Sequence, residues 1–472
     1  MKSTDKFGTA PLGKLLSQQA FPASIGILMM SIYAIVDTIY VGQYVGAYGI
    51  GAITVVLPIT FLISSSGMAI GIGGSSVLSR ALGEKNSEKA YRTFGNQVIM
   101  TVTLAIFFVL VGAFFTDEII HVFGGLGKVE EPAISYFNIV LIGVPFLAWS
   151  MMSNNVIRAE GYPRVAMFAM IIPAIVNMIL DPIFIIWLDM GIAGAAWATT
   201  ISYFGSAFFT LHHFVWGKSE LHFKIEYFKP SIPIIKEISA LGIVTLARQG
   251  VISLLALVLN NSLFHYGAER GLSIYGIVNR LLMFVNFPVL GITQGFVPIV
   301  SYNFGARMKE RVKQIVKISI AWASAISVLI FILLMTFAAN IAGLFTPDED
   351  LILETTPVIR TIFLATPLLA ISLIISAYFQ AIGKAKPALF LALTKQGIFL
   401  IPLVLILPIY FGLNGIWMAF PIADIGAALV SFLYYVLTPT KYPPILSKEK
   451  SDIEQQKPKE LHDTPKMSIS DE

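Results

Sequence analysis

The chain contains no cysteine and few charged residues. Of its 472 residues, only 13% are Asp, Glu, Lys or Arg, about half the share found in soluble domains. Without cysteine, the protein can form no disulfide, no haem–thiolate bond and no zinc site with thiolate ligands. The sequence also lacks a Walker A motif, which excludes nucleotide binding by a P-loop as the source of energy. These absences argue against a disulfide-stabilised domain, a thiolate-zinc protein and an ATP-driven machine.

Apolar sequence is what the chain has in abundance. Hydrophobic residues make up 56% of it, and the mean hydropathy is +0.77. Apolar runs of about twenty residues recur along its length, and each is long enough to cross a bilayer core of about 30 Å. The sequence therefore predicts an all-α polytopic membrane protein embedded in a lipid bilayer. The net charge of +4 does not indicate a nucleic-acid partner, because the distribution of these charges matters more than their sum.

The hydropathy pattern predicts twelve transmembrane helices. The polar N-terminal residues lead directly into the first span, which favours an uncleaved signal anchor over a cleaved secretory peptide. After Tyr442 the chain becomes polar and poor in aromatic residues, which is typical of a disordered tail. The expected spans are 16–42, 50–78, 93–115, 132–157, 165–187, 191–215, 238–264, 272–300, 315–342, 355–381, 388–410 and 413–437.

Basic residues are concentrated in every second connection between these spans. The odd-numbered connections contain only Lys128 and Arg270, beside several acidic residues. By the positive-inside rule, the even-numbered connections and both termini face the cytoplasm. One missed helix would scramble this alternation, so the alternation supports a count of twelve. The basic residues of the even-numbered connections are Arg80, Lys85, Lys89, Arg92, Arg158, Arg164, Lys218, Lys224, Lys229, Lys236, Arg307, Lys309, Arg311, Lys313, Lys317, Lys384 and Lys386.

Three sequence motifs occur twice at nearly the same separation. Six spans per repeat is an even number, so the repeats are predicted to lie parallel, related by an axis along the membrane normal. The motifs are VLSRALGEK (77–85) with IVSYNFGAR (299–307), RAEG (158–161) with QAIG (380–383), and GIAG (191–194) with GLNG (412–415), at offsets of 222, 222 and 221. The predicted domains are a cytoplasmic N-terminus (1–15), an N-lobe of helices 1–6 (16–216), a cytoplasmic linker (217–237), a C-lobe of helices 7–12 (238–438) and a disordered cytoplasmic tail (439–472).

Three carboxylates lie inside the predicted spans, at Asp37, Asp181 and Asp424. A charged group in hydrocarbon costs several kcal/mol unless it finds a partner or water, so such groups are usually functional. Asn177 and Asp181 are four residues apart and share one helix face. A rise of about 1.5 Å per residue places Asp37, Asp181 and Thr199 at similar depths in the outer half of the membrane. We therefore expect these three residues and Asn177 to form one group, the acidic cluster.

The alternative is that each carboxylate is a satisfied structural group, and for Asp424 we prefer that interpretation. The position in the second repeat that corresponds to Asp181 is apolar. The region that corresponds to Asp37 offers only Asn260 and Asn261. The acidic cluster is therefore expected in the N-lobe alone.

Several strings of the sequence resemble those of a known transporter family. They are VDTIYVGQ (36–43), ALGEKN (81–86), RAEGYPR (158–164), NMILDPIF (177–184), GAAWATT (194–200) and FGLNG (411–415). Together they resemble the multidrug and toxic compound extrusion (MATE) family, and within it the DinF-like prokaryotic branch. The resemblance implies a multi-pass protein of the prokaryotic plasma (inner) membrane. The resemblance covers about residues 10–440. Acidic residues that other branches carry in spans 7 and 10 are absent, which puts a coupling site in the C-lobe in doubt.

The resemblance also implies roles for particular residues. Tyr136 and Asn154 are expected to border the coupling site or the substrate cavity, and Pro22 to be the hinge of the first helix. Met170 is one of several methionines that could give this cavity an adaptable apolar wall, although ordinary packing explains methionine equally well. The implied site for a coupling proton or Na⁺ consists of Asp37, Asn177, Asp181 and Thr199.

The preferred function is secondary active multidrug efflux. The expected substrates are small amphipathic, often cationic compounds, exported by a monomer through antiport with H⁺ or Na⁺ and with no other cofactor. Two carboxylates close together in a medium of low dielectric cannot both stay ionised without a cation. Ion binding and drug binding are therefore expected to compete at the acidic cluster. Oxygen ligands suit a hard cation as well as a proton, so the sequence does not choose between them.

The two alternatives to efflux are a membrane-embedded enzyme and a flippase. An enzyme needs a nucleophile–base pair or a metal site, and the sequence shows neither. Its adjacent histidines, His212 and His213, point in different directions around a helix. A flippase for a lipid-linked saccharide can share the same architecture, and its anionic pyrophosphate would favour the basic residues in the C-lobe spans. These are Arg248, Arg280, Arg360 and Lys395.

Overall fold

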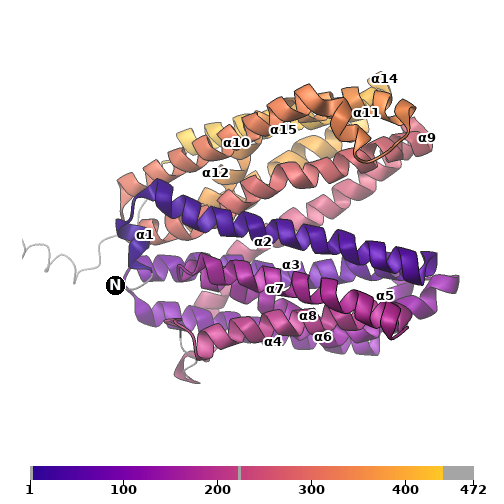
Figure 1. The fold of residues 1–472 in the computed structure, drawn as a ribbon. Helices are drawn as coiled ribbons and strands as arrows, with labels where there is room; N and C mark the ends of the chain where they lie inside the picture. Colours follow the sequence, from indigo (N-terminus) through magenta and orange to yellow (C-terminus); the bar gives the residue numbers. More distant parts are fainter. Residues whose placement is uncertain (1–3, 222–224, 440–472) are drawn as a thin grey trace, which may run out of the picture. The chain divides into compact units, whose positions relative to one another are not determined.

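The computed structural model describes residues 4–221 and 225–439, and these residues contain helices but no strand. Figure 1 shows long helices that run side by side. Nearly all of the tail expected over 439–472 lies outside the described residues, as do small parts of the N-terminus and of the linker. The first repeat contains α1 (Asp5–Thr9), α2 (Leu12–Tyr40), η1 (Val41–Val45), α3 (Ala47–Gly83), α4 (Ser87–Phe114), α5 (Thr116–Val122), η2 (Gly127–Val129), α6 (Glu130–Ala159), α7 (Pro163–Pro182), η3 (Ile183–Trp187) and α8 (Gly191–Val215).

The linker and the second repeat continue in the same style. Three of the short segments, η1, η3 and η6, are π-helical, whereas η2, η4 and η5 are 3₁₀-helical. The elements are η4 (Ile225–Tyr227), α9 (Ile232–Gly305), α10 (Lys309–Gly343), α11 (Glu349–Ile362), η5 (Phe363–Leu368), α12 (Leu369–Ala381), α13 (Ala385–Leu393), η6 (Thr394–Leu400), α14 (Ile401–Phe411) and α15 (Leu413–Leu437).

The predicted count of twelve spans is confirmed by these helices. Ten helical segments among the described residues are long and apolar enough to cross a membrane. The longest, α9, has 74 residues and a non-helical backbone at Ala268, so it comprises two spans. The less apolar α8, with 25 residues, supplies the twelfth. Some helices begin earlier than expected: α4 starts at Ser87, six residues before the expected span, because hydropathy does not register its polar first turn.

Backbone conformation repeats along the chain together with the sequence. Residues with positive φ lie at turns between helices, and most of them have a counterpart 221 or 222 residues away. The two parallel six-helix repeats therefore share their turns as well as their helices. The matched pairs are Gly46 (φ 90°) with Ala268 (47°), Lys85 (56°) with Arg307 (57°), Gly161 (84°) with Gly383 (82°), and Gly191 (56°) with Gly412 (55°).

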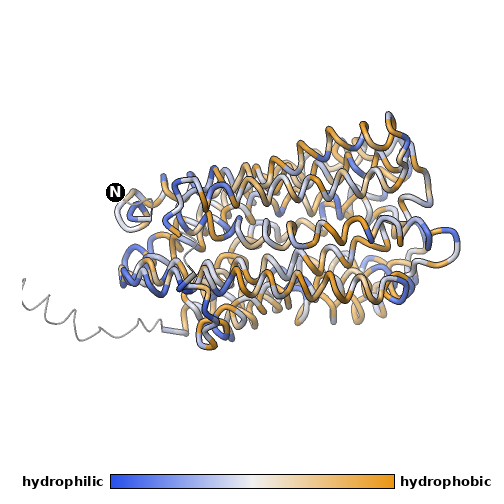
Figure 2. The backbone as a smooth tube through the Cα atoms, turned by 90° about the horizontal axis from the view of Figure 1, so that it is seen from below, coloured by the Kyte–Doolittle hydropathy of each residue, from blue (hydrophilic) through white to orange (hydrophobic). Residues whose placement is uncertain are grey.

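Polar residues collect at the two ends of the helices. Figure 2 shows hydrophobic residues mainly along the middle of the bundle and hydrophilic residues towards its ends. One end carries the α3–α4 and α9–α10 connections, with the basic residues Arg80, Lys85, Lys89, Arg307 and Lys309. We call this the basic end. This distribution is the one expected of a protein whose middle lies in hydrocarbon and whose ends lie in water.

The two repeats meet near the basic end, where α3 and α2 both pack against α9. Ser76 Oγ of α3 donates a hydrogen bond to the carbonyl oxygens of Gln380 (2.9 Å) and Ala381 (3.0 Å). Arg80 of α3 forms an ion pair with Glu237 at the start of α9, with 3.0 Å between Nη2 and Oε1. Polar contacts thus fasten the two repeats together at this end.

Two glycines allow the backbones of α3 and α9 to cross closely at this junction. A Cβ on Gly83 would lie 2.1 Å from the carbonyl oxygen of Tyr302, and one on Gly305 would lie 2.2 Å from the carbonyl oxygen of Arg80. Gly83 and Gly305 are repeat counterparts, 222 residues apart. The junction is therefore reciprocal: each repeat presents the same glycine to the other repeat's backbone.

Gly305→Ala is expected to push this crossing apart. The added methyl group meets backbone, which no side-chain rotation can relieve, so the free energy of unfolding should fall by about 1–3 kcal/mol. The thermal midpoint of the purified protein in detergent measures the effect. Gly250→Ala, also in α9, is the matched control, since a Cβ there meets nothing within 4 Å. Equal midpoints for the two variants would show that the junction tolerates a wider crossing.

Candidate functional site

The acidic cluster is assembled from three helices of the first repeat. Asp37 lies on α2, Asn177 and Asp181 on α7, and Thr199 on α8. The packing of α7 against both α2 and α8 brings these residues together. Asp181 is fully buried and Asp37 is only 9% exposed, although both are acidic. The grouping expected from helical spacing and depth is thus the one observed.

Asn177 connects the members of this cluster. Its Nδ2 lies 3.2 Å from Asp181 Oδ1 and 3.4 Å from Thr199 Oγ1, and it donates to both. The carboxyl groups of Asp37 and Asp181 are in hydrogen-bonding contact with each other. Two carboxyl groups can share such a contact only if a proton or another cation lies between them, because their negative charges repel.

The cluster leaves three buried oxygen atoms without a hydrogen-bond partner among the described residues. They are Asp37 Oδ1, Asp181 Oδ2 and Asn177 Oδ1. Within that part of the chain, no lysine or arginine forms an ion pair with either carboxylate. Buried polar atoms are normally satisfied, so a protein that leaves three of them together is suited to accept a ligand there. Carboxylate, amide and hydroxyl oxygens are the donors that a hard cation prefers.

Both helices that carry the carboxylates change to a π-helix just beyond them. On α2, the π-helical η1 begins four residues after Asp37; on α7, η3 begins two residues after Asp181. Pro182 explains the second change, since it has no backbone N–H and cannot continue the α-helical hydrogen bonds. A π-helical turn widens the helix and is often found at functional sites.

Three tyrosines surround the acidic cluster. The Tyr136 hydroxyl is hydrogen-bonded to Thr199, and the hydroxyls of Tyr33 and Tyr203 are hydrogen-bonded to each other. Tyr136 was expected near this site from the family resemblance, but Tyr33 and Tyr203 were missed. Helical spacing could have indicated them, because Tyr33 precedes Asp37 by four residues and Tyr203 follows Thr199 by four.

The structure does not bring Asn154 and Met170 to the acidic cluster. Asn154 is 18 residues after Tyr136 on α6, a distance of about 27 Å along the helix. Its Nδ2 donates to the carbonyl oxygen of Ala166 at 2.6 Å, and its Oδ1 accepts from Arg158 at 2.8 Å. Met170 Sδ also lies against Arg158, at 3.9 Å. Both residues belong to a second polar group nearer the basic end.

Arg158 is the centre of that second group, and sequence reasoning assigned it only to a connection. Its side chain is 2% exposed, and its Nη1 donates to Gln294 Oε1 of α9 across the junction between the repeats. The expected hinge residue, Pro22, lies near the same end, and α2 continues as an α-helix through it. The signal for Arg158 was the RAEG motif, which carries no information about which helix it meets.

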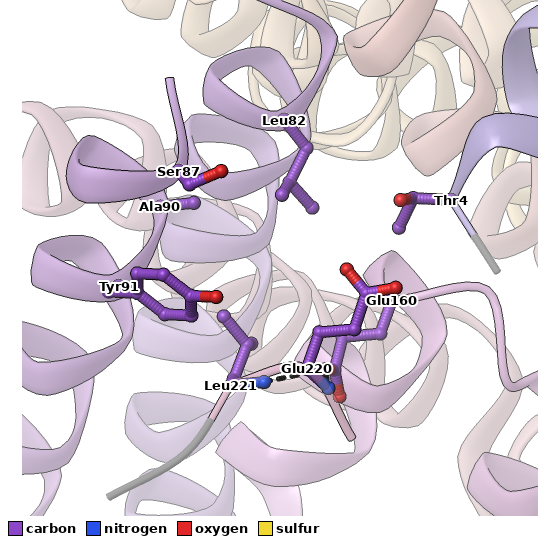
Figure 3. A pocket seen from close by; sticks show the side chains of 8 residues that line it. All are labelled: Thr4, Leu82, Ser87, Ala90, Tyr91, Glu160, Glu220 and Leu221. Atoms are coloured by element: carbon purple, nitrogen blue, oxygen red, sulfur yellow. Dashed lines mark hydrogen bonds between the residues drawn. The ribbon is translucent and has the colours of Figure 1, made fainter. Parts of the chain in front are cut away.

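A small pocket at the basic end contains the buried carboxylate of Glu160. Glu160 Oε1 accepts hydrogen bonds from Ser219 Oγ (2.7 Å) and from the backbone N–H groups of Glu220 (3.0 Å) and Leu221 (3.2 Å). Figure 3 shows this side chain in the pocket, with Tyr91 and Thr4 on its other sides. These contacts fasten the start of the linker to the end of α6, so Glu160 has a structural role.

A sequence model of the MatE family matches residues 22–183 and 246–406, one range in each repeat. The chain belongs to the MatE family. The first matched range includes Asp37, Asn177 and Asp181 of the acidic cluster, and Thr199 lies beyond it. As a MatE protein, the chain is a multi-pass membrane transporter and not an enzyme.

Relatives of this MatE protein include bacterial exporters. Multidrug export protein MepA of Staphylococcus aureus (strain MSSA476) is 29% identical over 431 residues, which cover 91% of this chain and 95% of that protein. MepA of Staphylococcus haemolyticus (strain JCSC1435) is 28% identical over 432 residues, covering 91% and 95%. The likeness therefore extends over nearly the whole length of both chains.

Solved structures of MATE transporters have the same fold. A crystal structure of MATE in the straight conformation matches with a TM-score of 0.87 at 26% identity, covering 92% of this chain and 97% of that chain. A structure described as the outward-facing conformation of a multidrug resistance MATE family transporter matches with a TM-score of 0.87 at 26% identity, covering 93% and 99%. A MOP superfamily transporter from Pyrococcus furiosus Vc1 (DSM3638) gives 0.86 at 26% identity, covering 92% and 97%.

Asp181→Asn is expected to leave this MatE protein folded and at least as resistant to heat as the parent. The substitution keeps the shape of the side chain but replaces one of two contacting buried carboxyl groups by a neutral amide, and removal of a buried ionisable group is often neutral or stabilising. Thermal unfolding in detergent provides the measurement. Asn177→Ala is the contrasting variant: it takes a donor away from Asp181 and Thr199 and should cost about 1–3 kcal/mol. A large loss of stability in Asp181→Asn would mean that Asp181 holds the fold together.

Proposed function

We propose that this protein exports amphipathic, often cationic organic compounds in exchange for protons or sodium ions. The observation that carries this proposal is the buried contact between Asp37 and Asp181, which have no basic partner among the described residues. Such a pair binds a cation of some kind by necessity. The names of the staphylococcal relatives, multidrug export proteins, support the choice of organic compounds as cargo.

Competition for the carboxylates would couple the two movements. A proton or Na⁺ that enters from outside neutralises the Asp37–Asp181 pair and removes the charge that attracts a cationic compound. A ligand shifts a conformational equilibrium only through different affinities for the two states, and this change of charge provides such a difference. The ion gradient can supply energy for export against a concentration gradient. A unit charge that crosses 100 mV gains about 2.3 kcal/mol, and each pH unit adds about 1.4 kcal/mol.

The position of the junction supports access to the acidic cluster from outside. The contacts between the repeats begin at the basic end and reach along the bundle as far as Ser24 of α2 and Gly291 of α9. Asp37 lies 13 residues further along α2, about 20 Å from that contact. We therefore assign this conformation to the outward-facing state. Export then requires the junction to open, as alternating access does in transporters built from repeats.

The orientation in the membrane is part of the proposal: the basic end faces the cytoplasm, and the protein works as a monomer. A cysteine introduced at Ser87, which is exposed at the basic end, should react with an impermeant thiol reagent only when the inner side of the membrane is accessible. A cysteine at Ala47, exposed at the opposite end, should react from outside in intact cells. The absence of native cysteine makes both signals free of background. Labelling of Ser87→Cys from outside would show that the basic end faces outward and would contradict the proposed orientation.

Transport into proteoliposomes, with proton and sodium gradients imposed separately, tests the function itself. Asp37→Asn and Asp181→Asn should each abolish uphill transport of a fluorescent organic cation, because a neutral side chain cannot alternate between charge states. Asn260→Ala and Asn261→Ala, exposed positions in the second repeat, are the controls and should retain most of the activity. Uphill transport by Asp181→Asn, or transport of a lipid-linked saccharide without an ion gradient, would contradict the proposal.

A further inference from the structure

The second repeat contains a buried ion pair that the proposed function does not use. Lys395 lies in η6 and Asp424 on α15, and these two elements pack together. The distance between Lys395 Nζ and Asp424 Oδ1 is 2.5 Å, and the two side chains are 19% and 10% exposed. Apart from this ammonium group, Asp424 Oδ1 has no polar partner among the described residues. The carboxylate therefore depends on Lys395 for its neutralisation.

The ion pair joins the same two helices of the second repeat that hold most of the acidic cluster in the first. A shift of 221 or 222 residues carries α7 and η3 onto the segment from α13 to α14, and α8 onto α15. Asp424 then corresponds to Ser202 or Tyr203, about one turn from Thr199. Lys395 corresponds to a position about two turns before Asp181 on α7. Both residues are therefore displaced towards the basic end relative to the acidic cluster. The ion pair lies between the equivalent two helices, but closer to the basic end.

Helix geometry strengthens this relation between the repeats. In the first repeat, η3 follows Asp181 directly; in the second, the π-helical η6 contains Lys395 itself. A π-helical turn changes the direction in which a side chain leaves the helix. The same local departure from α-helix thus accompanies a charged group in the equivalent helix of each repeat.

The difference between the two sites is the source of the positive charge. The acidic cluster has two carboxylates in contact and three unpartnered oxygens, with no lysine or arginine paired to it among the described residues. At Asp424, a lysine of the same chain supplies the cation. We propose that the second repeat contains a monovalent-cation site at Asp424 that is permanently filled by the Lys395 ammonium group. The exchange of ions is thereby confined to the first repeat, a consequence that rests on the proposed function, whereas the filled site rests on the ion pair alone.

Chemical rescue tests the filled site without any transport measurement. Lys395→Ala removes the ammonium group and most of its stem, and leaves Asp424 with an unpaired buried charge. Its thermal midpoint should fall by several degrees, and primary alkylammonium ions such as ethylammonium should raise it again. The parent should not respond to the same ions. Tetraethylammonium, which has no N–H donor and is larger, should rescue little.

The double variant Lys395→Met/Asp424→Asn provides the matched control. With both charges removed, it should be as stable as the parent and should not respond to ethylammonium. If the double variant is stable but ethylammonium has no effect on Lys395→Ala, or raises all variants equally, the proposed cation site does not exist. If Lys395→Ala cannot be purified, the same comparison is made with Lys395→Ser, which leaves nearly the same space open for ethylammonium and carries no charge.

The confinement of ion exchange to the first repeat has its own measurement. Equilibrium binding of a fluorescent organic cation to the double variant should keep the parent's dependence on pH and on sodium, while Asp181→Asn should lose it. Loss of that dependence in the double variant would mean that Asp424 takes part in ion exchange, which would overturn the proposal. Retention in both variants would instead contradict the proposed function and leave the result of the rescue experiment unaffected.

Discussion

The repulsion between two carboxylates in an apolar bundle is the constraint on which this structure depends. Asp37 and Asp181 lie on helices that are distant in sequence. The packing of α7 against α2 brings the two side chains into contact and buries both. Stability alone would favour apolar residues at these positions. Asn177 donates a hydrogen bond to Asp181, tyrosines surround the pair, and both helices change to a wider π-helix beside it. The cluster therefore keeps two buried carboxyl groups that are not neutralised by a basic side chain of the described residues and that favour the binding of a cation.

Much of this arrangement could be predicted from the sequence, because it follows from regular patterns of hydropathy, charge and residue spacing along the chain. Span length and the alternation of basic connections predicted the twelve helices, and the repeated motifs predicted the two parallel repeats. The spacing of Asn177 and Asp181 placed them on one helix face, and the equal depth of Asp37 and Thr199 completed the cluster. The inferences about span length, helix face and depth depend only on the rise and the turn of a helix, which are nearly the same in every protein.

The parts that could not be predicted depend on how particular helices meet. Arg158 and Gln294 are separated by 136 residues, and nothing local to either residue indicates that α6 reaches α9. Asn154 was expected to border the coupling site or the substrate cavity. The length of α6 separates it from the coupling site and places it against Arg158. The ion pair between Lys395 and Asp424 was missed because the two residues lie on different helices. Hydropathy and motif spacing contain no information about which side chains face each other across two helices.

The reciprocal crossing of α3 and α9 has a consequence for the way in which the protein moves. Gly83 and Gly305 make the same contact twice, about the axis that relates the repeats. A rotation of one repeat against the other separates both contacts in the same instant, and neither can persist when the other has been lost. The junction at the basic end thus behaves as a single cooperative unit. Such a joint is either fully seated or fully released, which keeps partly opened forms, through which ions would leak, sparsely populated.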